Sequence, residues 1–314
     1  MLPFHSAQRK SGWLSILPQG GKVTLAHVVR QRDSRPEVCL LDTFAADSGE
    51  CEALQRLRTT RQLKSYACTT LIGVGECNVT QLDSPSVPEE ERKEALRWAL
   101  KEMVSYPVAS ACIDVLDIPS TGLPPGRSAG VLVVSASELA VRSRVAVFEE
   151  AKIRLDVLDV PELAQRNVAA LLEDENRGLA FLRVDESGMM LTLTFQGELI
   201  AVRRGEITSL QLNSGSEDQR VRVKERLVLE LQRSLDNFDR QYSHIPISKV
   251  VLASYPLVAN LVADLSENTY VPVVEMDLTS VLGFSAVPEL KNLQYQVKNL
   301  LAIGAALRTD EVKS

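Results

Sequence analysis

The stretch LAFLRVDESGMMLTLTFQGELIAVRR, from Leu179 to Arg204, predicts three antiparallel strands joined by two tight turns. Apolar and polar residues alternate in its LTLTF segment, and a glycine stands in each turn, Gly188 and Gly197. Alternation with a period of two indicates a strand with one buried face, and glycine between such runs indicates a turn. We therefore expect a three-stranded meander here, with its first turn at 185–188 and its second at 196–197.

The beginning of the chain follows the same plan. Its expected strands are Trp13–Leu17, Lys22–Arg30 and Glu37–Phe44, and the first two are joined by the turn 18–21. In each half, helical patterns and a short apolar strand follow the meander, and these strands are expected at 66–74 and 249–254. Strands that alternate with helices are typical of α/β lobes. The sequence therefore predicts an α/β fold with two similar halves.

The length of the chain also indicates two lobes, because 314 residues are many for one hydrophobic core. We predict an N-terminal lobe over residues 1–175 and a C-terminal lobe over 176–314. The polar run 174–178 is the expected boundary between them. A small subdomain is expected to be inserted into the first lobe at about 75–135.

Inside this subdomain we expect a helix over 88–105 and two strands. Apolar residues at three-and-four spacing place Leu96, Leu100 and Met103 on one face of the helix, whereas Trp98 lies on another face. The strands are expected at 111–116 and 131–135. The run 117–130 between them is rich in proline and glycine, which predicts a loop.

The longest expected helix runs from about 218 to 241. Its apolar residues, among them Leu231, fall on a single stripe. A stripe of this kind normally packs inside its own lobe, so we expect a core helix here and not a partner-binding one.

The composition is that of an ordinary globular protein, with 45% hydrophobic and 24% charged residues. A net charge of −6 opposes binding to nucleic acid, and the densest basic group, 203–226, is interleaved with acids. No stretch approaches the roughly 18 consecutive apolar residues of a membrane-spanning helix, and the N-terminus lacks the apolar core of a signal peptide. We therefore expect a cytoplasmic protein that binds no nucleic acid.

Motifs of enzymes and of metal sites are missing from the sequence. The three histidines, His5, His27 and His244, belong to no catalytic or zinc-binding pattern. The five cysteines are odd in number and show no C-x-x-C spacing, which predicts reduced thiols and no metal site. Neither the P-loop nor the dinucleotide-binding fingerprint occurs. We expect no cofactor.

Four longer segments resemble the PilM-type proteins of type IV pilus assembly, a branch of the actin-like ATPases. They are RWALKEMVSYPVASACIDVLDIP at 97–119, IRLDVLDVPELAQRNVAAL at 153–171, ERLVLELQRSLDNFDRQY at 225–242 and LLAIGAALR at 300–308. These segments follow the order of the family across nearly the whole chain. The resemblance implies a duplicated, two-lobe actin-like fold, which is ribonuclease H-like. Within the family, the sequence is most similar to the branch of the mannose-sensitive haemagglutinin (MSHA) pilus.

Actin-like ATPases hold a nucleotide in three turns, and the resemblance places these turns in this chain. The corresponding positions are Gln19, Gly20 and Gly21 in the first turn, Asp185, Ser187 and Gly188 in the second, and Ser254 in the third. The first turn lacks the expected Asp, Glu186 adds a carboxylate to the second, and the bulky pair Tyr255-Pro256 follows in the third. A carboxylate repels phosphate, and proline offers no N–H group to it. We therefore predict a degenerate site that neither binds nor hydrolyses a nucleotide.

The resemblance further implies a scaffold function at the inner face of the inner membrane. PilM-type proteins bind the short cytoplasmic tail of a bitopic, PilN-like membrane protein, which would make this chain peripheral to the membrane through its partner. The partner-binding candidates are Trp98, Tyr106 and Pro107, with 111–116 as a strand edge for an extended peptide. The rival interpretation is that Trp98 and Tyr106 fill the core of the subdomain.

Two other functions remain open at this point. One is a working ATPase or nucleotide switch, which would need phosphate contacts that the three turns do not suggest. The other is the cytoplasmic portion of a GspL-like protein of type II secretion, which would share the fold. Such a portion should continue into a membrane span, and this sequence shows none.

Overall fold

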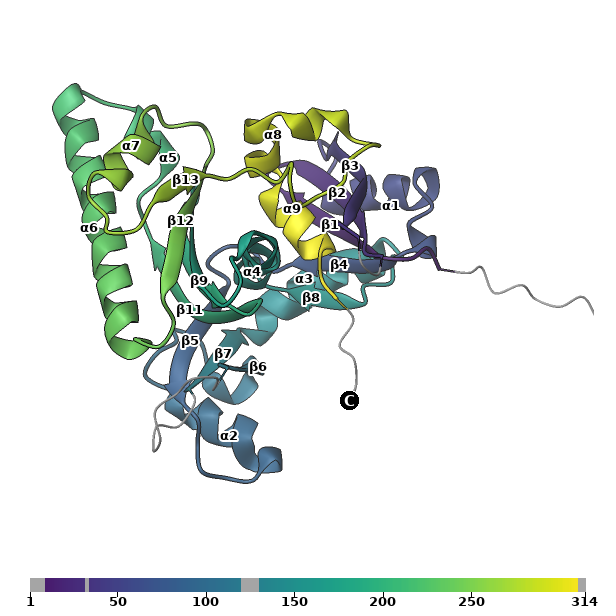
Figure 1. Ribbon diagram of the computed structural model, residues 1–314. Coiled ribbons are helices and arrows are strands. Elements are labelled where there is room, and N and C mark those ends of the chain that lie inside the picture. The colour runs from purple at the N-terminus through teal and green to yellow at the C-terminus, as the bar shows by residue number, and fades with distance from the viewer. Residues whose placement is uncertain (1–8, 32–33, 120–129, 310–314) are drawn as a thin grey trace, which may run out of the picture.

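The computed structural model describes residues 9–31, 34–119 and 130–309, which form two lobes and an inserted subdomain (Figure 1). Each of these parts is built on its own sheet. Of the loop expected at 117–130, residues 120–129 lie outside the described part. No helix among the described residues is both long enough and apolar enough to cross a membrane.

The sheet of the N-terminal lobe has the strand order β3-β2-β1-β4-β8. Its strands are β1 (Trp13–Gln19), β2 (Lys22–Val29), β3 (Glu37–Ala45), β4 (Ala67–Leu71) and β8 (Val157–Asp159). The first three strands are antiparallel neighbours, as the meander pattern predicts. Strand β4 then runs parallel to β1, and β8 runs parallel to β4.

The sheet of the C-terminal lobe repeats this arrangement in the order β11-β10-β9-β12-β13. Its strands are β9 (Gly178–Asp185), β10 (Gly188–Phe195), β11 (Glu198–Gly205), β12 (Ile247–Ser254) and β13 (Val273–Glu275). Again an antiparallel meander is followed by two parallel strands. The expected duplication of the two halves is therefore confirmed at the level of sheet topology.

Two helices lie between the sheets and contact each other, α4 (Pro161–Leu172) and α9 (Leu300–Ala306) (Figure 1). Helix α4 packs on β9, β10 and β11, whereas α9 packs on β1, β2 and β4. A Cβ at Gly304 would lie 2.0 Å from the carbonyl oxygen of Ala164, so glycine allows the helices to approach closely. Because α9 comes from the end of the chain and packs on the first sheet, the lobes are interlocked. The division at residue 175 stays a prediction.

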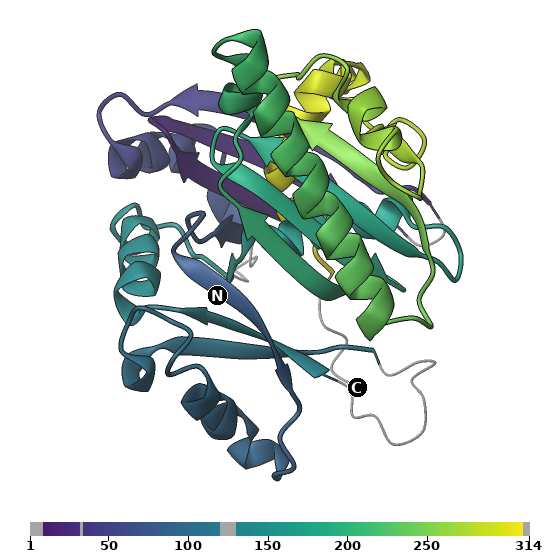
Figure 2. The ribbon, with the colours of Figure 1, turned by 90° about the vertical axis from the view of Figure 1, so that its left-hand side faces the viewer.

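The outer face of the C-terminal sheet is covered by α6 (Glu217–Gln241), the longest helix, as Figure 2 shows. A capping box of Ser216 and Gln219 begins it, which satisfies N–H groups of its first turn. Its stripe of Leu227, Leu231, Leu235 and Phe238 is buried, as the spacing predicts. The remaining helices of the lobes are α1 (Glu50–Thr60), η1 (Leu63–Ser65), α3 (Glu138–Glu150), α5 (Ser209–Asn213), α7 (Leu261–Ser266), η3 (Pro288–Lys291) and α8 (Leu293–Lys298).

The inserted subdomain is a three-stranded sheet with one helix on it. Its elements are β5 (Cys77–Asp83), α2 (Glu89–Ala99), η2 (Val108–Ser110), β6 (Cys112–Asp117) and β7 (Gly130–Ala136), with β7 central in the sheet. Leu96 and Leu100 pack on Val131 and Val133. The helix is shorter than expected, and the sequence prediction for Met103 is wrong, because α2 ends at Ala99 and Met103 is 55% exposed. Turns follow α2 on the way to Pro107, and proline disfavours helix in the residue before it.

Candidate functional site

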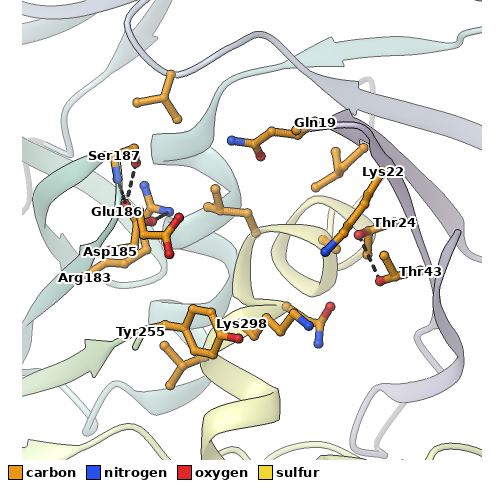
Figure 3. Close-up of a pocket in the computed structure, with 17 residues that line it drawn as sticks. Gln19, Lys22, Thr24, Thr43, Arg183, Asp185, Glu186, Ser187, Tyr255 and Lys298 are labelled. Atoms are coloured by element: carbon orange, nitrogen blue, oxygen red, sulfur yellow. Dashed lines mark hydrogen bonds and ion pairs between the residues drawn. The ribbon is translucent and has the colours of Figure 1, made fainter. Parts of the chain in front are cut away.

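A cavity of about 350 Å³ lies between the lobes, where the first hairpin turns of the two meanders converge (Figure 3). Gln19 and Gly20 line it from the N-terminal lobe, and Asp185 and Ser187 line it from the C-terminal lobe. These four residues were predicted from sequence as positions of one site. Gly21, Gly188 and Ser254 do not line the cavity.

The first turn is a two-residue hairpin connection made by Gly20 and Gly21. Both have positive φ, 57° and 70°, and β1 and β2 pair up to Gln19 and Lys22 on either side of them. Two successive positive φ angles are those of a type I′ turn, which suits the twist of paired strands. The glycines are therefore explained by the hairpin itself.

The second turn is held together by the carboxylate of Asp185. Asp185 Oδ1 accepts hydrogen bonds from the Ser187 backbone N at 2.8 Å and from Ser187 Oγ at 2.5 Å. The other oxygen, Oδ2, pairs with Arg183 Nη1 at 2.5 Å. Gly188 has a φ of 130°, and a Cβ there would lie 2.5 Å from the carbonyl oxygen of Gly205. Both residues thus have structural roles, and the Ser187 N–H is already occupied by a side chain.

The third turn places an aromatic ring on the cavity where a glycine-rich turn would leave it open. Tyr255 lines the cavity and is joined to Pro256 by a cis peptide bond. The Tyr255 backbone N donates to the carbonyl of Val184, and Ser209 Oγ donates to the carbonyl of Tyr255. Ser254 is buried, and its hydroxyl accepts from the Val258 backbone N. The segment is therefore held from several sides.

Three cations reach the cavity that the sequence reasoning did not single out. Lys22 follows the first turn directly, Lys298 ends α8, and Arg183 lies in β9 (Figure 3). Neither lysine has an ion-pair partner among the described residues. Burial lowers the pKa of the Arg183 guanidinium, and the nearby Asp185 opposes this effect. The position of Lys22 beside the turn could have been noticed in the sequence, whereas Lys298 is brought in only by the fold.

The chemistry of this cavity is mixed in charge. Glu186 and Asp185 face Lys22 and Gln19 across it, as Figure 3 shows. Lys22 and Lys298 can attract an anion, whereas Glu186 repels one. No group of three or more potential metal ligands occurs in residues 9–31, 34–119 and 130–309. Of the groups expected in a phosphate site, the Asp185 carboxylate and the Ser187 N–H are bonded to each other.

A second hollow of about 400 Å³, which we call the edge groove, separates the inserted sheet from the N-terminal lobe. It is flanked by β6 on one side and by β8 on the other. Within the described chain, β6 pairs only with β7, and β8 pairs only with β4. Each strand therefore has one edge without a neighbouring strand, and both border the same groove.

The floor of the edge groove is apolar and its rim is charged. Val134, Val141 and Leu158 are half-buried there and pack on one small cluster. At the rim, Lys93 Nζ pairs with Asp114 Oδ1 at 2.9 Å, and both side chains are largely exposed.

Asp159 is the buried charge of the edge groove. Its carboxylate pairs with Arg308 Nη1 at 2.8 Å and accepts from the Val160 backbone N at 2.8 Å. Burial raises the pKa of Asp159, which these two contacts oppose. The groove thus combines a short charged rim with an aliphatic floor. The carboxylate of Asp159 is buried and paired, so it adds no exposed charge to the groove.

The three predicted partner-binding residues lie in sequence between Lys93 and Cys112, which line the edge groove, but they do not line it themselves. Trp98 is 66% exposed at the end of α2, so it does not fill the core. Tyr106 is half-buried, and its hydroxyl donates to Ser135 Oγ at 2.9 Å and accepts from Asn78 Nδ2 at 3.2 Å. Pro107 is exposed just before η2, which leads into β6.

Comparisons with known proteins identify the fold. No protein-family model matches the sequence, and no curated protein does. A solved PilM-PilN type IV pilus biogenesis complex is similar over 95% of this chain and 98% of that chain, with a TM-score of 0.74 and 19% identity. The cytoplasmic domain of EpsL, an inner-membrane component of the type II secretion system of Vibrio cholerae, matches over 92% and 94%, with a TM-score of 0.47 and 13% identity.

A protein of Bacteroides thetaiotaomicron with an actin-like ATPase fold matches over 95% of this chain and 98% of that chain, with a TM-score of 0.48 and 11% identity. The first likeness, together with the duplicated sheets and the interlocked helices α4 and α9, establishes the fold. The chain has the two-lobe actin-like fold, as the resemblance implies. At this identity the likeness shows the fold alone.

Proposed function

We propose that this chain is a non-catalytic, PilM-like cytoplasmic scaffold that holds the tail of a PilN-like inner-membrane protein in the edge groove. The observation that carries the proposal is the pair of open strand edges, β6 and β8, on either side of one apolar hollow. The likeness to the PilM-PilN complex supports the choice of partner. The chain would then lie at the inner face of the inner membrane through this partner.

An extended peptide fits the groove for physical reasons. Open strand edges present backbone N–H and C=O groups, which an added strand can satisfy along its length. In β6 the side chains of Cys112 and Asp114 point to one face of the sheet, and that of Ile113 points to the other. An added strand would therefore place every second side chain on the same face as Cys112 and Asp114. The aliphatic floor of Val134, Val141 and Leu158 would receive apolar side chains of the tail. Main-chain pairing would supply affinity, and this floor would supply selectivity.

The non-catalytic part of the proposal rests on the interlobe cavity. In its second turn the Asp185 carboxylate accepts a hydrogen bond from the Ser187 backbone N. Its third turn carries Tyr255, and Glu186 lines the space between the lobes. These features oppose phosphate binding without disturbing the fold. The finer assignment to the MSHA pilus rests on the sequence resemblance alone.

A nucleotide switch is the second candidate function. It is favoured by Lys22 and Lys298, which reach the cavity without an acidic partner in the described residues. Two such lysines could balance Glu186 and hold a small anion or a phosphate group. Titration with ATP separates the two candidates and is described below.

Variants of the groove floor test the scaffold proposal. Val141→Glu and Leu158→Glu each place a charge against the aliphatic floor, and we expect each to weaken binding of a fluorescent PilN-like tail peptide by about 2 kcal/mol or more. Leu229→Glu is the matched control, because Leu229 is 42% exposed on α6, far along the chain from the groove elements. Fluorescence anisotropy gives the affinity, and circular dichroism checks the fold. Equal affinity in all three variants would place the tail elsewhere.

A further inference from the structure

Acidic residues are unevenly distributed along this chain of net charge −6. No aspartate or glutamate occurs in residues 1–32 or in residues 53–75, although the chain contains 41 acids. The structure brings described parts of these two segments together, because the Lys10 backbone N donates to the Ser65 carbonyl at 2.7 Å. One end of the N-terminal lobe is therefore expected to carry a local excess of positive charge.

Five cations gather at this end, and we call them the basic surface: Arg9, Lys10, Arg58, Lys64 and Arg154. Arg58 and Lys64 flank a hollow of about 360 Å³ that also includes Ser65. Neither of them has an ion-pair partner among the described residues. Lys10 Nζ donates to the Tyr66 hydroxyl at 2.8 Å and lies 4.5 Å from the centre of that ring. Because Tyr66 is neutral, the charges of Lys10, Arg58 and Lys64 are not balanced by an ion pair among the described residues.

The other two cations share one carboxylate, that of Asp156. Asp156 Oδ1 pairs with Arg9 Nη2 at 3.1 Å and with Arg154 Nε at 3.0 Å. Its Oδ2 accepts from the Cys68 backbone N at 3.0 Å. The Asp156 side chain is 11% exposed, against 42% for Arg9 and 78% for Arg154. The carboxylate is therefore turned inward, and the cations face the solvent.

We infer that the basic surface binds the anionic headgroups of a phospholipid bilayer. It lies at the end of the molecule marked by α1, where the described chain begins (Figure 1). Juxtaposed lysines and arginines of this kind attract anionic membranes, and each cation near the surface contributes roughly a fivefold gain in binding. Nucleic acid fits less well, because Tyr66, whose ring lies against Lys10 at this surface, is only 9% exposed and leaves little ring face on which a base could stack.

In the proposed function the chain reaches the membrane only through its PilN-like partner. Binding of the basic surface to lipid would add a direct contact with the membrane. It does not depend on the edge groove, since none of the five cations lines that groove. A vesicle experiment without any partner peptide therefore tests it separately, and the tail peptide can be tested in the absence of lipid.

The experiment measures cosedimentation of the full chain with vesicles of phosphatidylcholine alone and with vesicles containing equal amounts of phosphatidylglycerol. We expect binding only to the second kind, and we expect added salt to weaken it, because exposed charges are screened. The triple variant Lys10→Gln, Arg58→Gln, Lys64→Gln should bind roughly 100-fold more weakly, since three cations are removed. The matched control is Arg222→Gln, Arg226→Gln, Arg233→Gln, which removes three exposed cations from α6.

The inference stands if the control triple variant binds like the parent while the first triple variant does not. It is overturned if the parent ignores phosphatidylglycerol, or if the two triple variants lose binding equally. Thermal unfolding of both variants guards against loss of the fold. A parent that prefers a short RNA or DNA duplex to these vesicles at equal salt, with the same three residues required, would also overturn the assignment to a bilayer.

Discussion

Strand β10 inside the sheet of the C-terminal lobe and strand β6 at the edge of the sheet of the inserted subdomain differ in how completely their residues are buried. Every residue of β10 is buried, whereas every residue of β6 is exposed or half-buried. Helices α4 and α6 cover the first sheet on its two sides, while α2 covers the second on one side (Figures 1 and 2). The first region is built for stability, because buried apolar area stabilises the fold. The second leaves a strand edge free, which is what an extended partner needs.

The largest expected effect lies at the junction of these two regions. Arg204 of β11 pairs with Glu162 of α4, whose side chain is fully buried, and Arg204 Nη1 also donates to the Cys77 carbonyl of the subdomain at 3.4 Å. Arg204→Met would leave the Glu162 carboxylate unpaired, so we expect a loss of about 3–5 kcal/mol in the free energy of unfolding. Chemical denaturation measures it, with Arg203→Met as the neighbouring control. An unchanged midpoint for Arg204→Met would mean that the pair does not join the regions.

The core of the C-terminal lobe should give the next largest effect. Leu231 of α6 is completely buried, so Leu231→Ala should cost about 2–5 kcal/mol through lost burial and a cavity. Leu229, two residues away on the same helix, is 42% exposed, and Leu229→Ala should cost far less. Denaturation midpoints compare the two variants. Tail binding should be unaffected in both, and equal midpoints would contradict the assignment of this stripe to the core.

The subdomain should show the reverse behaviour, a change in binding with the fold kept. If Trp98 or Tyr106 anchors the tail, replacement by Ala should weaken tail binding by about 1–4 kcal/mol while the fold remains intact. Tyr106→Phe separates the ring from the hydroxyl, which bonds to Ser135 and Asn78. Anisotropy and circular dichroism are the two readouts. Full binding in both alanine variants would confine the tail to the edge groove itself.

Thiol labelling can locate the tail without mutation. Cys112 is exposed in the edge groove, whereas burial raises the pKa of Cys68 to about 12 and that of Cys77 to about 11. At neutral pH, iodoacetamide should therefore modify Cys112 and spare the two buried thiols. Tail peptide at ~10 times its dissociation constant should slow the labelling of Cys112 roughly tenfold by mass action. Exposed Cys39 of β3 is the internal control, and equal slowing of Cys39 and Cys112 would argue against binding at the groove.

The smallest effect is expected in the interlobe cavity, because we predict that it does not bind a nucleotide. We expect calorimetric titration with ATP and Mg²⁺ to give no dissociation constant below about 1 mM, which corresponds to roughly −4 kcal/mol. Tighter binding would contradict the degenerate site and favour the nucleotide switch. In that case Lys22→Ala and Lys298→Ala should each weaken it, because both lysines reach the cavity.

Local patterns in the sequence predicted much of the fold. Alternation in LTLTF and the glycines at the turns predicted both meanders, and the apolar stripe predicted α6. These signals are reliable because the period of a strand or helix depends on neighbouring residues alone. The end of α2 was predicted less well, since the turns before Pro107 interrupt the periodic pattern that includes Met103.

The two sites depend on contacts between residues far apart in the chain. Placing Gln19 and Asp185 at one cavity required the family resemblance, and no local pattern brings Lys298 beside them. The edge groove has the same origin, because an edge is open or paired according to which strand lies next to it, and the inserted sheet and β8 meet only in the folded molecule. Side-chain types and periods are properties of short segments, whereas cavities and open edges arise from the packing of whole lobes.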